Sequence, residues 1–366
     1  MAGSGKRIWG KLTSPFAMFI YKKIVFFAGA AIISMTFLFF LQEAVGDPPH
    51  EVMVRMAQAR GGGNVFANVG GGSSGGSVGR WERLAEIYAE QFGVLESIES
   101  RFVDWWKNIF TLNFGPSVTG WPREVTDMIA RRLPWTIALV LPALPFGFVI
   151  GNWIGSRAAY YGGKLDNFLY YLSNYLQRAP VFWVALIVVM IFAGYLDILP
   201  SGGAYDTNMF ITGPRFELDF FISAVKHWII PFFTIALLPI GGWAVGMRSM
   251  TLYEMESDYM QYSKQLGFSE EKLRQIAERN AILPNFTGIP QIFNILIGQT
   301  LIVEIVMGYN GLGYLFYDAA VPPIDVPLLQ ATFLITLLIV LAGNFVIDVL
   351  YGVLDPRIGT GYVGGE

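Results

Sequence analysis

Long apolar runs alternate with polar stretches along this chain. Six runs approach the roughly 20 apolar residues that an α-helix needs to cross the hydrocarbon core of a bilayer. They cover residues 24–41, 135–154, 180–196, 228–245, 289–307 and 328–351. Because a bilayer offers no water to backbone polar groups, each run is expected to satisfy them internally as a helix. The pattern predicts an all-α membrane protein with six transmembrane helices.

The polar stretch between the fourth and fifth runs has a helical pattern of its own. On one predicted helix, apolar residues recur at spacings of three and four, at Leu252, Met255, Tyr259, Tyr262 and Leu266. Gly267 suits the left-handed position that closes a helix, and Ser269 is a natural N-cap for the next one. That second helix is expected to end at Pro284. Its apolar face consists of Leu273, Ile276, Ala277 and Ala281. The sequence thus predicts a helix, a tight turn and a second helix.

The segment after the first run is long and has two parts. Residues 61–79 are so rich in glycine that they are expected to form a flexible tether. Beyond them, apolar residues recur at helical spacing, which predicts one or two amphipathic helices packed against the membrane domain. These residues are Trp81, Leu84, Tyr88, Leu95, Ile98, Phe102 and Ile109. The first run itself is too long for a signal peptide and is interpreted as a retained anchor.

The distribution of lysine and arginine predicts the orientation in the membrane. Five lie in residues 1–23 and five in residues 248–284, whereas residues 308–327 have none. The predicted cytosolic parts are therefore the N-terminus 1–23, the loop 155–166, the stretch 248–284 and the C-terminus 354–366. Residues 42–134 are predicted to form an extracytoplasmic segment between the first helix, 24–41, and a five-helix membrane core, 135–353.

Composition supports a membrane protein and argues against several kinds of chemistry. Of the 366 residues, 54% are hydrophobic and 14% are charged, and the net charge of −3 does not suggest a nucleic-acid partner. The chain has no cysteine and two histidines, so no metal site is expected. The sequence "GSGK" at residues 3–6 lacks the first glycine and the Ser/Thr of a phosphate-binding loop and is interpreted as a basic terminus. No catalytic residue is predicted.

Polar side chains inside the predicted spans are costly and commonly face a bundle interior or a water-filled cavity. The candidates for contact with a transported molecule are Asn294, Gln299, Glu304, Asn344 and Asp348. The alternative is that Asn344 and Asp348 join helices, or that Asp348 lies in water near the end of its span. Gly311 and Gly313 are predicted to permit a tight turn after the fifth span.

Several stretches carry motifs in a particular order along the chain. The polar stretch offers Arg248, Ser249, Met250, Glu254, Asp258, Tyr259, Gly267 and "RNAILP" at residues 279–284. Around it come "GDPP" at 46–49, "VTDMIARRLPWTIAL" at 125–139, "VEIVMGYNGLGYLFYDAA" at 303–320 and "DVLYGVLDPRIG" at 348–359. Together these motifs resemble the permease subunits of ABC importers, in the dipeptide and oligopeptide branch. The resemblance covers nearly the whole chain except roughly residues 50–90, although Tyr262 and Ser263 replace the small residues of that family.

The resemblance implies the type I ABC importer permease fold. It also implies that the turn at Gly267 belongs to a coupling segment, which docks in a cleft of an ATPase subunit and moves the spans as a body. The implied residues of the coupling segment are Gln261, Ser263, Leu266, Gly267, Phe268, Ser269, Glu270 and Glu271.

The resemblance further implies the partners and the cargo. The partners would be a homologous second permease, two cytosolic ATPase subunits that bind ATP and Mg, an extracytoplasmic solute-binding protein and the lipid bilayer. The chain itself would bind no cofactor and would lie in the plasma membrane with both termini cytosolic. Peptides are the implied solute, and oligosaccharides are the alternative. A secondary transporter driven by an ion gradient, which favours inverted repeats and paired ion ligands, and a membrane anchor or sensor are the rival classes.

Overall fold

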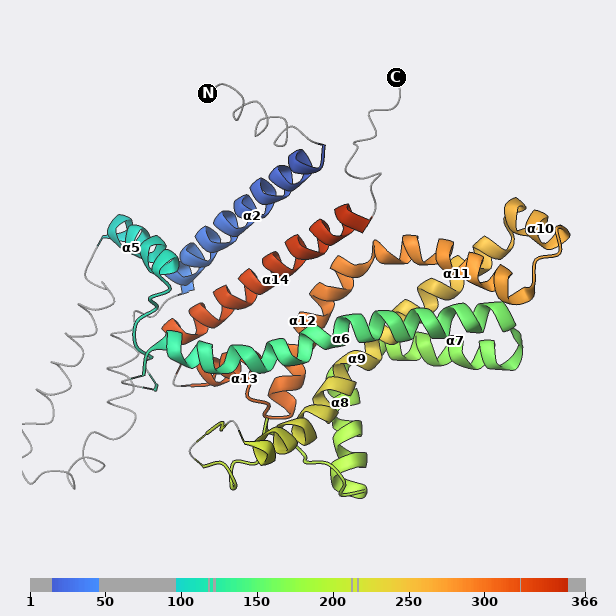
Figure 1. The fold of residues 1–366 in the computed structure, drawn as a ribbon. Helices are drawn as coiled ribbons and strands as arrows, with labels where there is room; N and C mark the ends of the chain where they lie inside the picture. The colour runs from blue at the N-terminus through green and yellow to red at the C-terminus, as the bar shows by residue number, and fades with distance from the viewer. Residues whose placement is uncertain are drawn as a thin grey trace, which may run out of the picture. The chain divides into compact units, whose positions relative to one another are not determined.

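The computed structural model describes residues 15–45, 97–117, 119–120, 123–211, 213–215, 217–322 and 324–354. Over these residues the chain is built from helices, and an isolated bridge joins Pro116 to Glu124. The helices are α2 (Pro15–Val45), α5 (Ile98–Thr111), α6 (Val125–Tyr161), α7 (Gly163–Arg178), α8 (Val181–Val189), the π-helix η1 (Met190–Tyr195), α9 (Leu218–Met255), α10 (Asp258–Gln265), α11 (Glu270–Phe286), α12 (Ile289–Val306), α13 (Leu312–Ala320) and α14 (Val326–Leu354) (Figure 1). The predicted all-α class is confirmed. The glycine-rich tether 61–79, the "GSGK" and "GDPP" motifs and the stripe residues Trp81 to Leu95 lie outside the described residues.

Five of the described helices are long and apolar enough to cross a membrane. They contain the spans Ala17–Leu41, Val125–Tyr161, Leu218–Met255, Ile289–Val306 and Val326–Gly352. A sixth crossing exists if α7 and the α8–η1 helix, which meet at an angle of 107°, count as one broken span. The predicted number of six spans is therefore confirmed if this bent pair of helices is counted as one span.

The third predicted span, 180–196, is the one that differs most from the structure. Its helical part, 181–195, is only about 22 Å long at 1.5 Å per residue, which is shorter than a hydrocarbon core of about 30 Å. The bend arises at Ala179, whose extended backbone (φ −66°, ψ 133°) is what a following proline imposes on the residue before it. Residues 181–195 can therefore form a full crossing only together with α7, the helix that precedes Pro180.

The predicted loop 155–166 is wrong. α6 continues to Tyr161, and α7 begins at Gly163 after a turn in which Gly162 and Gly163 have φ values of +63° and +77°. Hydropathy marks only the part of a helix that is apolar, so it misses the polar ends that continue the same helix. For the same reason α2, α6 and α9 all extend beyond the apolar runs within them.

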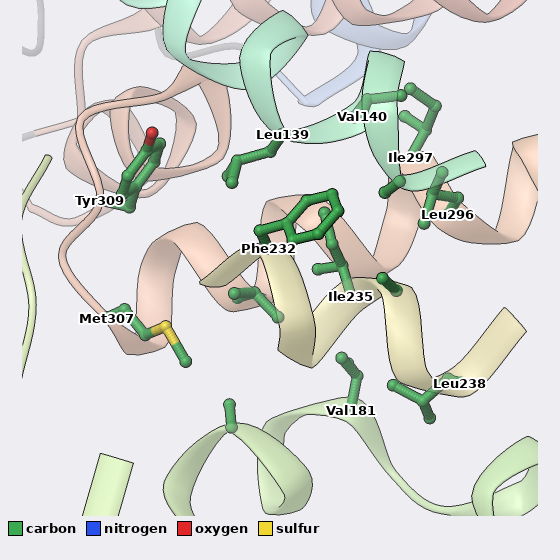
Figure 2. Packing of buried hydrophobic residues seen from close by; sticks show 14 of the residues in the cluster. Leu139, Val140, Val181, Phe232, Ile235, Leu238, Leu296, Ile297, Met307 and Tyr309 are labelled. Atoms are coloured by element: carbon green, nitrogen blue, oxygen red, sulfur yellow. The ribbon is translucent and has the colours of Figure 1, made fainter. Parts of the chain in front are cut away.

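The chain divides into two compact units, which share several helices. The first comprises Met1–Phe27, Pro134–Tyr314 and Ile339–Glu366. Within it, α9 packs against α7, α8, α11 and α12. Its core contains Leu139 from α6, Ile235 from α9 and Leu296 from α12, all fully buried. Figure 2 shows the ring of Phe232 among these side chains, and Val181 of α8 belongs to the same apolar core.

The second unit comprises Ala28–Leu133 and Leu315–Leu338. Ile109, a residue of the predicted amphipathic stripe on α5, is buried together with Met35 and Leu334. Ile98, another residue of this stripe, stands at the start of α5 and is exposed. Asp325 caps α14 by accepting from the Leu328 amide, at 3.2 Å. Its other carboxylate oxygen accepts from the Ser117 hydroxyl at 2.5 Å, which ties the loop after α5 to this helix end.

Candidate functional site

The predicted helix, turn and helix are present as α10, residues 266–269 and α11. Gly267 has φ +78°, and its amide donates to the Lys264 carbonyl at 3.0 Å. The next amide, that of Phe268, donates to the Ser263 carbonyl at 3.3 Å and closes the turn. Ser269 is the N-cap of α11, and its hydroxyl oxygen accepts from the Lys272 amide at 3.3 Å. The roles that the sequence predicts for Gly267 and Ser269 are confirmed.

Three details of this stretch differ from the prediction. The single helix expected through Leu252 and Leu266 is broken, because α9 ends at Met255 and α10 begins at Asp258. Between them Ser257 has an extended backbone (φ −67°, ψ 149°) and donates from its hydroxyl to the Glu254 carbonyl at 2.5 Å. Serine favours such an N-terminal position over a helix interior because its side chain competes for backbone groups.

The buried face of α10 consequently differs from the predicted apolar face. Met260, which the heptad-like spacing omitted, is the residue of α10 that is buried, and it packs against Leu273 and Ala277 of α11. The expected end at Pro284 is also wrong, because α11 continues to Phe286. A proline so close to a helix end removes few backbone hydrogen bonds, so the last turn persists.

The turn presents apolar side chains to its surroundings. In this chain the exposed fractions of the side chains of Tyr262, Leu266 and Phe268 are 62%, 57% and 44%. Gln261 is also exposed and donates to the Glu256 carbonyl at 3.3 Å. Exposed apolar groups on a backbone fixed by a glycine turn and an N-cap form a surface suited to a partner protein.

α11 carries an ion-pair network beside the turn. Arg274 is buried and donates to Glu271 and to Glu278, each at 2.6 Å. The hydrogen bond from Arg274, followed by one from Gln275, lowers the pKa of the Glu271 carboxyl below its ordinary value. Glu271 therefore stays charged at neutral pH, and the network fixes the first turns of α11.

Tyr259 shows how α10 is held to its neighbours. Its hydroxyl donates to the Glu254 carboxylate, and it accepts from the Asn280 amide at 2.8 Å. Burial, followed by the hydrogen bond to Glu254, raises the pKa of the Tyr259 hydroxyl. The side chain thus connects the end of α9 to the middle of α11.

Glu304 lies fully buried near the end of α12. Its Oε1 accepts from the Thr136 hydroxyl of α6 at 2.7 Å, and its Oε2 accepts from the Gly313 amide at 2.6 Å. The Thr136 oxygen in turn accepts from the Leu312 amide at 2.8 Å. The carboxylate and the threonine together hold the residues after α12, 307–313, against α6. We call residues 307–313 the gate turn, after their predicted position near the outer gate of the solute path.

The glycines of the gate turn act differently from the prediction. The left-handed backbone position is at Gly308 (φ +57°), not at Gly311 or Gly313. A Cβ at Gly311 would overlap the Glu304 carboxylate, and one at Gly313 would lie 2.6 Å from the Leu301 carbonyl oxygen. Gly311 and Gly313 thus allow close approach to α12, while Gly308 supplies the turn.

The other candidate pathway residues lie as follows. Asn344 of α14 donates to the Asn294 side chain of α12 at 2.7 Å. Asp348 of α14 forms an ion pair with Lys23 of α2 at 2.7 Å. Gln299 has its buried Oε1 without a hydrogen-bond partner among the described residues. Asn344 and Asp348 thus join helices, and the assignment of the five residues to a solute path stays a prediction.

Sequence reasoning missed several polar residues that the fold brings together. Asp166 of α7 accepts two hydrogen bonds from Arg248 of α9, each at 2.6 Å, and Tyr170 lies under the guanidinium at 4.7 Å. On α6, Asn152 and Ser156 contact α11, at Asn285 and Glu278. The spacing of four between Asn152 and Ser156 was a signal of one shared helix face, but the partner helix was not evident from sequence.

Over the described ranges, no group of three or more His, Cys, Asp or Glu side chains is arranged to hold a metal ion. The acids of the helix–turn–helix are instead engaged with Arg274, Tyr160 and Tyr259. The site thus consists of exposed apolar side chains at the turn and buried polar contacts between helices.

The apolar helices are typical of an integral membrane protein, and comparison with known proteins specifies the family. The family described as "Binding-protein-dependent transport system inner membrane component" matches residues 143–360. The chain therefore belongs to this family, as its motifs predict.

Named relatives cover most of the chain. The oligopeptide transport system permease protein AppB of Bacillus subtilis is 30% identical over 282 residues, which are 75% of this chain and 84% of the relative. The probable D,D-dipeptide transport system permease protein DdpB of Escherichia coli is 26% identical, over 78% of this chain and 86% of the relative. The oligopeptide transport system permease protein OppB of Haemophilus influenzae is 27% identical, over 93% of this chain and 98% of the relative. The type I permease fold predicted from the motifs is thus confirmed.

Proposed function

We propose that this chain is a permease subunit of an ATP-driven importer of peptides. The names of the three relatives given above, which are peptide transport permeases, support the solute class. With a homologous second permease it would form the translocation path. An extracytoplasmic solute-binding protein would deliver the peptide, and two cytosolic ATPase subunits, which bind ATP and Mg, would drive the switch in access.

The observation that carries the mechanism is the exposed apolar turn. A turn held by Gly267, Ser269 and the Arg274 network keeps its shape when it is pushed. Leu266 and Phe268 project from it and are the side chains best suited to enter a cleft of another protein. We propose that Gln261, Ser263 and Leu266 to Glu271 form the coupling segment that contacts the ATPase subunit.

We also propose an orientation in the plasma membrane. Lysine and arginine are frequent in residues 1–23 and 248–284, which supports a cytosolic position of the coupling segment and of both termini. Residues 42–134 would then be extracytoplasmic, because a span separates them from residues 1–23. The membrane core, 135–353, would carry the path.

A carrier driven by an ion gradient fits the geometry less well. Such carriers use midplane carboxylates as ion ligands. In this chain the two carboxylate oxygens of Glu304 already accept hydrogen bonds from Thr136 and Gly313. The carboxylate is therefore used in contacts within the chain and is less suited to bind an ion. Asp348 is paired with Lys23.

The proposed function is tested by uptake into liposomes. The chain is reconstituted with a homologous permease, the ATPase subunits and a solute-binding protein of the same organism. Uptake of labelled oligopeptide and of labelled oligosaccharide is then measured with and without ATP. ATP-dependent uptake of the peptide is expected. Uptake of the sugar alone would change the solute class, and uptake driven by an ion gradient without ATP would refute the importer.

The coupling segment is tested in the same liposomes with Gly267. Gly267→Ala places a side chain on a left-handed backbone, where it has space but costs about 1–2 kcal/mol. Peptide uptake is expected to fall several-fold while the ATPase subunits still hydrolyse ATP. Gly267→Asn is the matched control, because asparagine tolerates this conformation and should retain most uptake. Normal uptake by Gly267→Ala would remove this segment from the coupling mechanism.

A further inference from the structure

Helix α6 makes polar contacts at both of its ends. Toward its C-terminal end, three side chains on one face, four residues apart, contact α11. We call these contacts the polar ladder: Asn152 with Asn285, Ser156 with Glu278, and Tyr160 with Glu270. Toward its N-terminal end, Thr136 bonds Glu304 and the Leu312 amide. The same helix therefore touches both the element that carries the coupling segment and the gate turn.

The hydrogen bonds of the polar ladder have short donor–acceptor distances, and some of their side chains are buried. The Asn285 amide donates to the Asn152 side-chain oxygen at 2.6 Å, and the Ser156 hydroxyl donates to Glu278 at 2.7 Å. The Tyr160 hydroxyl contacts the carboxylate of Glu270, a residue of the coupling segment. Asn152 and Ser156 are buried, so losing a partner leaves polar groups without water to replace it.

The ladder is continuous with the network beside the coupling segment. Glu278 accepts from Ser156 of α6 and also from Arg274, through the same oxygen. Arg274 reaches back to Glu271, at the start of α11. A displacement of Glu270 and Glu271 would thus be transmitted to α6 through side chains in direct contact.

α6 contains Pro142 and Pro145 between its two contact regions, and prolines can bend a helix. This part is supported by close packing on α9. A Cβ at Gly147, two residues after Pro145, would lie 3.3 Å from the Pro239 side chain of α9 and 3.7 Å from the Ala236 carbonyl oxygen. Leu139, one turn before Pro142, is fully buried in the core of Figure 2. The prolines therefore lie where a neighbouring helix restrains them.

We infer that α6 is the element through which the coupling segment moves the gate turn, with Tyr160 and Thr136 as positioning residues at its two ends. The inference rests on the proposed function and specifies its mechanical path. When the ATPase subunits displace the coupling segment, the polar ladder makes α6 follow α11. The Thr136 hydroxyl, bonded to Glu304 and Leu312, makes the gate turn follow α6.

The test is a double-mutant cycle in the reconstituted importer, read as peptide molecules imported per ATP hydrolysed. Thr136 and Tyr160 are separated by about 36 Å at the helical rise of 1.5 Å per residue. Tyr160→Phe and Thr136→Val are each expected to lower this ratio at least about threefold while ATP hydrolysis continues. If both act on one path, the double variant loses little more than either single variant. Sites so far apart normally give additive effects, so additive losses would refute the inference.

Matched controls separate this role from general damage. Tyr161→Phe removes the hydroxyl of the neighbouring tyrosine, which is 67% exposed. Thr336→Val removes a hydroxyl that donates to the Thr332 carbonyl of its own helix, at 2.8 Å. Both controls are expected to keep the wild-type ratio. Thr136→Ser, which retains the hydroxyl, is expected to restore at least half of it. An unchanged ratio in Tyr160→Phe and Thr136→Val, with normal wild-type uptake, refutes the inference alone, whereas absent wild-type uptake refutes the proposed function.

A cross-link provides a second measurement, because the natural chain has no cysteine. Ser156→Cys with Glu278→Cys breaks the middle contact of the ladder and should lower the ratio. A short bifunctional thiol reagent that bridges the two cysteines should restore it, since α6 and α11 then move together again. Loss of the remaining uptake on bridging would show that the two helices must separate, and would refute the inference.

Discussion

The Glu304 carboxylate accepts hydrogen bonds from Thr136 of α6 and from the Gly313 amide of the gate turn, and it is fully buried. Burying a charge is costly unless its hydrogen-bonding capacity is used, so these donors explain how the acid is tolerated at this depth. The sequence alone left a solute contact and a structural contact equally open for this residue. The geometry favours a structural role within the single chain.

Glu304→Ala is expected to destabilise the chain by about 2–4 kcal/mol, because it leaves the Gly313 amide and the Thr136 hydroxyl without their acceptor. Glu304→Gln keeps an acceptor for one of the two donors and should cost about half as much. Thermal unfolding in detergent micelles measures both. If the two variants unfold like the wild type but change which peptides are taken up, Glu304 contacts the solute instead.

Gly311→Ala should destabilise the chain by about 1–3 kcal/mol, because the added methyl group meets the Glu304 carboxylate. Gly298→Ala is the matched control on α12, since a Cβ there meets no atom within 4 Å and alanine favours the helix by about 1 kcal/mol. The two unfolding midpoints are compared under the same conditions. Equal midpoints would contradict the packing of the gate turn on α12.

At the scale of elements, polar side chains stabilise contacts between apolar helices. α2 and α14 are both strongly apolar, and an apolar helix has no hydrophobic preference for another helix over lipid. The ion pair of Lys23 with Asp348 and the edge-to-face contact of Phe27 with Phe345 specify that these helix ends meet. The Asp348 carboxylate is favourable at this position only while Lys23 is present as its counter-ion.

Asp348→Asn is accordingly expected to lower stability by about 1–2 kcal/mol, since it leaves the Lys23 ammonium, which is one third exposed, without its counter-ion. The exchange Lys23→Asp with Asp348→Lys should recover most of the loss. Both are measured by thermal unfolding in micelles. No recovery in the exchange variant would show that Asp348 acts through a contact other than Lys23.

At the scale of the whole molecule, the family shows a membrane component of a transport system, and the side of each loop is a proposal from charge. The absence of natural cysteine makes this proposal easy to test. Lys264→Cys, on the exposed face of α10, and Ile211→Cys, in the loop before α9, mark the two proposed sides.

A membrane-impermeant thiol reagent added to intact cells should label Ile211→Cys and leave Lys264→Cys unlabelled until the cells are opened. The physical reason is that α9 lies between the two positions and crosses the bilayer. The wild-type chain is the control for background. The reverse pattern of labelling would invert the orientation and would place the coupling segment out of reach of a cytosolic ATPase.

The sequence by itself determined the features that are encoded locally. Apolar length fixed where helices cross the bilayer, and the turn at Gly267 with its N-cap Ser269 followed from short-range backbone preferences. The motifs further indicated the family. Where the prediction and the structure differ, a local feature is responsible. The chain bends at Ala179, just before Pro180, and Ser257 separates α9 from α10.

Only the tertiary structure decided which distant side chains meet. No periodicity in the sequence links Thr136 to Glu304, Ser156 to Glu278 or Asp166 to Arg248, because each pair depends on how two helices cross. The crossing is set by packing over many residues, including glycines such as Gly155 that let backbones approach. Hydrogen bonds between helices are therefore consequences of the assembled fold, and they connect the coupling segment to the rest of the chain.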